Sequence, residues 1–140
     1  MWFNVFVLFI MLFMHTIADF VLQIPCLSDL KQIKKWNEFT KDMFDKNVEE
    51  TMYRNDYAVA LLMHSFMWAF MTFVPLLLIG QNYWLLILII VVNSIIHLLI
   101  DNIKANFYLI SLCKDQGWHI NQILISYTIY LLLQNWSIGF

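Results

Sequence analysis

Apolar residues gather in four long runs, at about 2–25, 57–79, 84–104 and 118–138. A membrane-spanning helix needs about 20 mainly apolar residues, and each run reaches that length. The third run is the most continuous, whereas polar residues such as Asn121, Gln122 and Ser126 interrupt the fourth. The pattern therefore predicts an all-α, polytopic membrane protein. We expect a single domain with four transmembrane helices in a bundle, in which the fourth helix spans with the support of the other three.

The composition agrees with a chain embedded in a membrane. Of its 140 residues, 61% are hydrophobic, against about 45–50% in soluble domains. The net charge of −2 gives no support to nucleic-acid binding. Cys26 and Cys113 match no metal-binding spacing. The first run lacks a basic flank and a small-residue cleavage site, and it carries His15 and Asp19. We therefore expect a retained membrane helix there rather than a signal peptide.

The basic residues predict how the chain is oriented. All eight lie in the connection between the first two runs or at the junction of the last two: Lys31, Lys34, Lys35, Lys41, Lys46 and Arg54, then Lys104 and Lys114. Lysine and arginine concentrate in cytoplasmic loops. We therefore expect a multi-pass protein of the inner (cytoplasmic) membrane, with basic loops in the cytoplasm and both termini outside. The connection 26–56 is expected to be helical and amphipathic, either lying on anionic lipid or forming a solvated linker.

Three His/Asp pairs, each one helical turn long, lie in or beside the apolar runs: His15-x3-Asp19, His97-x3-Asp101 and, reversed, Asp115-x3-His119. Residues i and i+4 share one face of a helix. Because the fourth helix runs opposite to the first and third, each histidine is expected to lie deeper than its aspartate. His64 in the second helix has a matching depth. His119 counts as shallower unless its helix begins earlier than residue 118. All four histidines are thus predicted in the cytoplasmic half, one per helix.

Two interpretations of this polar cluster are open. In one, His15, His64, His97 and His119, with Asp19 and Asp101, bind a divalent transition metal such as Zn, Mn or Fe. Asp19, Asp101 and Asp115 then act as ligands, as partners that orient the histidines, or as a general base. In the other, the same groups hydrogen-bond across helices, each bond contributing about 0.6–2 kcal/mol. Three pairs in one sense, together with His64, favour a functional site. The three carboxylates make haem an unlikely cofactor.

Three other polar residues are candidates for the edge of the site. Lys104 could pair with Asp101, reach a lipid phosphate, or extend to the interface, and the last is what we expect. Gln23 and Gln116 could line the site or cap helix ends.

These motifs resemble a family of small bacterial and phage integral-membrane proteins of unknown function. Its pattern H-x3-D-F-x2-Q matches His15, Asp19, Phe20 and Gln23; a lysine that follows is matched by Lys31, Lys34 or Lys35; and a histidine early in the second helix is matched by His64. The patterns H-x3-D-x2-K and D-Q-x2-H match His97, Asp101, Lys104, Asp115, Gln116 and His119. Trp68 stands where some relatives have a second histidine, and the first connection is longer than usual. The resemblance implies the four-helix fold and the site, and it supplies no reaction.

Two classes of function follow. The first is a metal-dependent enzyme, a hydrolase acting at the cytoplasmic face. The second is a non-enzymatic module that carries ions or protons, or that binds another membrane protein or a second copy of the chain. A conduction path needs polar residues through the outer half of the bundle, and that half is almost wholly apolar in the first three helices. This distribution argues against a pore.

Overall fold

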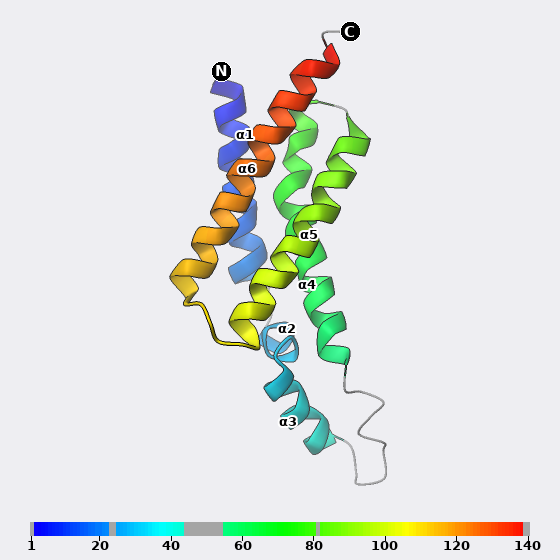
Figure 1. Cartoon of the computed structure of the whole chain (residues 1–140), viewed down its shortest axis with the longest axis vertical. Coiled ribbons are helices and arrows are strands. Elements are labelled where there is room, and N and C mark those ends of the chain that lie inside the picture. Colours follow the sequence, from blue (N-terminus) through cyan, green and yellow to red (C-terminus); the bar gives the residue numbers. More distant parts are fainter. Residues whose placement is uncertain (1, 23–24, 44–54, 81, 139–140) are drawn as a thin grey trace.

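The computed structural model describes residues 2–22, 25–43, 55–80 and 82–138. Four long helices dominate it: α1 (Trp2–Thr16), α4 (Asp56–Phe73), α5 (Tyr83–Ala105) and α6 (Leu112–Ile138). They alternate in direction and pack as a closed ring, with α1 against α4, α4 against α5, α5 against α6, and α6 against α1 (Figure 1). Within the described residues the chain forms helices and turns without any strand. The prediction of an all-α fold class is confirmed for these residues.

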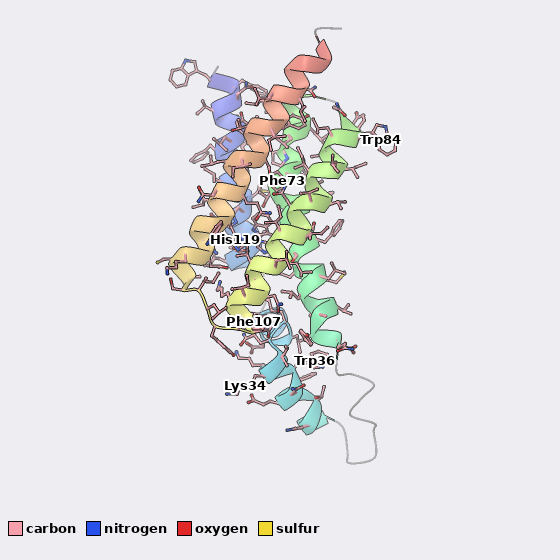
Figure 2. The ribbon with its side chains drawn as sticks, viewed as in Figure 1. Lys34, Trp36, Phe73, Trp84, Phe107 and His119 are labelled. Atoms are coloured by element: carbon pink, nitrogen blue, oxygen red, sulfur yellow. The ribbon has the colours of Figure 1, made fainter. Side chains whose placement is uncertain are left out.

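Three segments are long and apolar enough to cross a membrane: Trp2–Val21, Asp56–Leu78 and Tyr83–Ala105. The fourth long helix, α6, extends over 27 residues and is more polar. Large apolar side chains on the outside of all four helices are exposed, including Phe9, Met63, Leu88 and Ile125. Figure 2 shows Trp84 pointing away from the bundle near the start of α5. An apolar exterior of this extent is typical of a surface that faces lipid.

The helix ends follow from local sequence. Asn82 caps α5, because its side chain accepts a hydrogen bond from the Leu85 backbone N–H at 3.1 Å. Pro75 lacks an N–H and cannot continue α4, so the chain tightens there into the 3₁₀ helix η2 (Val74–Leu78). The helix α2 (Pro25–Leu30) begins at a proline, which suits the first helical position. Counted through η2, the second predicted helix (57–79) is observed as Asp56–Leu78, and the third (84–104) as Tyr83–Ala105.

Two helices differ from their predicted ranges. The first is α-helical only to Thr16 and continues as the π-helix η1 (Ile17–Val21) rather than as an α-helix to about residue 25. The last begins at Leu112, six residues before the predicted start at 118. The polar residues Lys114, Asp115 and Gln116 form its first turns, where an acidic side chain interacts favourably with the helix dipole.

The first connection forms two short helices at the end of the bundle where both basic connections lie (Figure 1). Of these, α2 packs against α4, and α3 (Ile33–Met43) extends away from the bundle. The start of α1 and the end of α6 lie at the opposite end (Figure 1). The connection 26–56 was expected to be helical, and its residues 44–54 lie outside the described residues.

The interior is divided by polarity. Toward the end of the bundle with the chain termini, the core is apolar and includes Val7, Met11, Phe73, Leu76 and Tyr130, all fully buried. Figure 2 shows Phe73 among the four helices, and His119 lies nearer the basic end. The buried polar and charged side chains toward that end include all four histidines, two aspartates and a lysine. Such a concentration of ionisable groups among apolar helices is expensive, and it usually marks a functional site.

Candidate metal centre

The four histidines converge. His15, His64, His97 and His119 come from α1, α4, α5 and α6, and each is at most 3% exposed. The ring centroids of His64 and His97 are 5.3 Å apart, those of His97 and His119 are 4.1 Å apart, and those of His15 and His119 are 6.0 Å apart. The early start of α6 brings His119 to the depth of the others. The predicted meeting of four histidines, one per long helix, is thus observed.

Four side-chain atoms from three helical segments form a candidate ligand set: His64 Nε2, His97 Nε2, Asp19 Oδ1 and Asp101 Oδ2. His64 Nε2 lies 3.3 Å from His97 Nε2, 3.3 Å from Asp101 Oδ2 and 3.8 Å from Asp19 Oδ1. His97 Nε2 lies 3.8 Å from Asp101 Oδ2 and 4.0 Å from Asp19 Oδ1. Ligand bonds of about 2.0–2.2 Å give tetrahedral edges of about 3.3–3.6 Å. Asp19, His64 and His97 therefore form one group that could hold a metal ion after a small contraction, and Asp101 Oδ2 lies beside both of its imidazole nitrogens.

A second group of potential ligands shares His97 and consists of His97, Asp101 and His119. His97 Nδ1 lies 3.1 Å from His119 Nδ1. With Nε2 of His97 as a ligand, its proton is on Nδ1, which donates to His119. His119 then carries its own proton on Nε2, which lies 3.4 Å from both Asp101 Oδ1 and Asp115 Oδ1. His119 and Asp115 are thus placed to orient His97 from behind, as partners of metal-bound histidines commonly do.

His15 has a different partner. The indole N–H of Trp68 donates to His15 Nδ1 at 2.8 Å, and the indole ring stacks on His97 with centroids 4.0 Å apart. A neutral imidazole that accepts at Nδ1 carries its proton on Nε2 and has no second lone pair for a metal. His15 belongs to neither ligand group. We had predicted His15 as a ligand, and the structure places it at the edge of the cluster, 3.8 Å from Asp19 Oδ2.

The π-helical turn η1 carries Asp19. The Leu22 backbone N–H donates to the Ile17 carbonyl at 2.9 Å, which is the i→i+5 bond of a π-helix. Turns of this kind are rare and often lie at functional sites. His15 and Asp19 still lie close together across the start of this turn, with His15 Nδ1 3.8 Å from Asp19 Oδ2. Gln23 itself lies outside the described residues.

Lysines complete the site from the basic end. Lys31, which follows α2, is buried and donates to Asp101 Oδ2 at 2.5 Å. Lys104 donates to Asp115 Oδ2. The expectation that Lys104 extends to the membrane interface is therefore wrong, because a buried carboxylate lies within its reach. From its position in the sequence, Lys31 was expected only in the basic connection 26–56. The family resemblance alone made it a candidate for the site.

Amide side chains fix this arrangement. Gln116 Nε2 donates to Asp19 Oδ2 at 2.9 Å and to Asp115 Oδ2 at 3.2 Å. Gln116 therefore lines the site, which is one of the two roles expected for it. Asn106 Oδ1 accepts from the Ile33 N–H at 2.8 Å, and Asn106 Nδ2 donates to the Lys31 carbonyl at 3.3 Å. Asn106 therefore holds the α2–α3 junction, and Lys31 with it, against the end of α5. No motif identified Asn106 in advance.

Comparisons of the chain with protein-family models, with curated proteins and with solved structures found no match. The resemblance noted from the motifs therefore stays a prediction.

Proposed function

We propose that this chain is a four-span inner-membrane protein that binds a divalent transition metal in the cytoplasmic half of its bundle and acts as a metal-dependent hydrolase. The ligands are His64, His97, Asp19 and Asp101. The observation that carries the proposal is the approach of two imidazole nitrogens and two carboxylate oxygens, with every distance from a nitrogen between 3.3 and 4.0 Å. Imidazole and carboxylate together suit Zn, Mn or Fe.

The orientation rests on the distribution of charge. Both basic connections occupy one end of the bundle, and the metal site opens toward that end. Cytoplasmic loops carry the excess of Lys and Arg, so the site faces the cytoplasm. A divalent ion there would polarise a bound ester and lower the pKa of water, which is the usual contribution of such ions to hydrolysis.

The competing proposal, a carrier of ions or protons, is less well supported. Three polar side chains in the outer half of α6 bond to other helices: Ser126 donates to Asn93 Oδ1 at 3.0 Å, Tyr127 to the Asn4 carbonyl at 2.6 Å, and Tyr130 to the Leu76 carbonyl at 3.3 Å. These bonds tie helices together and favour a closed outer half. Metal or proton flux through liposomes containing the protein would favour the carrier instead.

The direct test is the metal content of the purified full-length protein in detergent, after exposure to zinc, manganese or iron and removal of excess ion. We expect about one ion per chain, and a loss of most of it in His64→Gln and His97→Gln. Thr72→Val is a matched control, because Thr72 is also fully buried on α4 but lies two turns beyond His64. His15→Gln should retain the ion, since Nδ1 of His15 is occupied by Trp68. A metal-free wild type, or full occupancy in a His64→Ala/His97→Ala double variant, contradicts the proposal.

A further inference from the structure

A pocket of about 160 Å³ leads from the basic end of the bundle to the candidate metal centre. Its lining combines two ligand carboxylates, two lysines, a glutamine and two apolar side chains: Asp19, Asp101, Lys31, Lys104, Gln116, Phe20 and Leu112. Lys31 and Lys104 also line a neighbouring pocket on the side of Tyr108. The lysines therefore lie at the entrance through which a substrate would reach the ligands.

The charge at this entrance favours an anion once a divalent ion is bound. Asp19, Asp101 and Asp115 contribute three negative charges, and Lys31 and Lys104 contribute two positive charges. With neutral histidines, a divalent ion makes the site positive by about one charge. Buried charges act strongly because the low local dielectric screens them little. A neutral substrate would leave this charge unbalanced, whereas an anionic group would neutralise it.

The lysines also match the shape of a particular anion. An ammonium group has three N–H donors, so a lysine that donates to one carboxylate can donate to a second acceptor as well. A phosphate ester offers several acceptor oxygens and can contact two lysines and a metal centre together. A carboxylate has only two oxygens, so it cannot offer a separate oxygen to each of the two lysines and to the metal centre. We propose that the pocket binds a phosphate ester, whose phosphate is held between Lys31 and Lys104 against the metal centre. This inference rests on the proposed function.

The two apolar residues of the pocket suggest where the rest of the substrate lies. Phe20 and Leu112 are 56% and 53% exposed, on the outer surface of the bundle. In a membrane this surface meets lipid near the headgroups, so the entrance joins a polar pocket to the apolar phase. The phosphate chemistry is shared by a phospholipid headgroup and by a soluble phosphoester, and the open apolar side fits an acyl chain. Hydrolysis would join the oxygen of water to phosphorus, break the bond from phosphorus to the ester oxygen, and transfer a proton from water to the leaving alcohol.

The test uses full-length protein loaded with zinc and titrated with inorganic phosphate in a calorimeter. We expect binding in the wild type and an affinity weakened by about 10- to 100-fold in Lys104→Gln, the loss expected for one charge-assisted hydrogen bond. Lys34→Gln is the matched control, because it removes an exposed lysine from α3. Since Lys31 is buried beside Asp101, Lys31→Gln is measured together with Lys31→Arg, which keeps the charge and should retain more affinity.

Two further arms separate the sources of the phosphate. Phosphate release is measured from phosphatidic acid in nanodiscs and from para-nitrophenyl phosphate in solution, with phosphatidylcholine nanodiscs as background. Release from phosphatidic acid alone identifies a lipid substrate, and release from the soluble ester identifies a small phosphoester; both support the phosphate pocket. Stoichiometric zinc without phosphate binding, or equal affinities in the wild type and Lys104→Gln, overturns the pocket and leaves the metal centre standing. If the protein binds none of zinc, manganese and iron, the metal centre and this inference are both overturned.

Discussion

The ion pair between Lys31 and Asp101 fastens the first connection to the bundle, and its contribution can be measured against a second pair in the same chain. The side chains of Lys31 and Asp101 are 9% and 4% exposed, whereas those of Lys35 and Asp29, which also form an ion pair, are 46% and 50% exposed. Removing one partner of a buried pair leaves an uncompensated charge and costs about 3–5 kcal/mol. Exposed pairs contribute only about 0–1 kcal/mol. Lys31→Met and Asp101→Asn should therefore destabilise the protein far more than Lys35→Met and Asp29→Asn.

The assay is a pair of double-mutant cycles on metal-free protein in detergent, with unfolding followed by tryptophan fluorescence. Removal of metal keeps the role of Asp101 as a ligand out of the comparison. For the buried pair we expect the double variant to cost less than the sum of the single variants, because no lone charge remains buried. The exposed pair should show nearly additive effects. If Lys31→Met costs no more than Lys35→Met, Lys31 does not enter the bundle, and the docking of the α2–α3 junction on α5 is refuted.

Three further outcomes are expected. Trp68→Phe removes the N–H that donates to His15 and leaves a buried acceptor unpaired, so it should cost about 1–3 kcal/mol of stability while metal content is retained. A loss of metal would mean that the Trp68–His15 hydrogen bond is needed to hold the ion. Gly117→Ala should stabilise α6 by up to about 1 kcal/mol in a thermal unfolding assay, because a Cβ there meets nothing within 4 Å. Gly80→Ala should give no such gain in the same assay, because its Cβ would clash with Gln134. Zinc at about 100 times its dissociation constant should raise the unfolding free energy by about 2.7 kcal/mol, and a chelator should reverse the rise. An equal rise in the His64→Ala/His97→Ala double variant would mean that the ion binds elsewhere.

The main helices were predictable because each is marked by a mainly apolar run of sufficient length. For α5 the predicted range 84–104 and the observed Tyr83–Ala105 nearly coincide. The start of α6 was missed because the criterion follows apolar residues, and its first turns are polar. An acidic residue in the first turn, Asp115, was the available signal for an earlier start.

The site was predictable in depth but not in detail. Counting residues along each helix placed three histidines at one level, and it allowed His119 to join them if its helix began early. The separate roles of the four histidines could not be predicted from the sequence, because they depend on contacts between helices. Trp68 donates to Nδ1 of His15, and Nδ1 of His119 lies beside Nδ1 of His97. Lys31 and Asn106 were missed for a related reason. Their importance comes from contacts that join residues about 70 positions apart in the chain.

The π-turn at Ile17–Val21 uses one residue more than an α-helix needs for the same rotation. Before it, Val7, Met11 and His15 recur every four residues and face the core; within it, the widened turn directs Asp19. Deleting one residue from the turn would therefore allow a continuous α-helix and keep the residues on either side nearly in phase, since one residue accounts for about 100° of rotation. The packed face would be kept, and the carboxylate of Asp19 would lose the turn that positions it. By contrast, exchanging a residue other than Asp19 for one of similar size leaves the turn intact, so the site should tolerate such substitutions better than a change in the length of this segment.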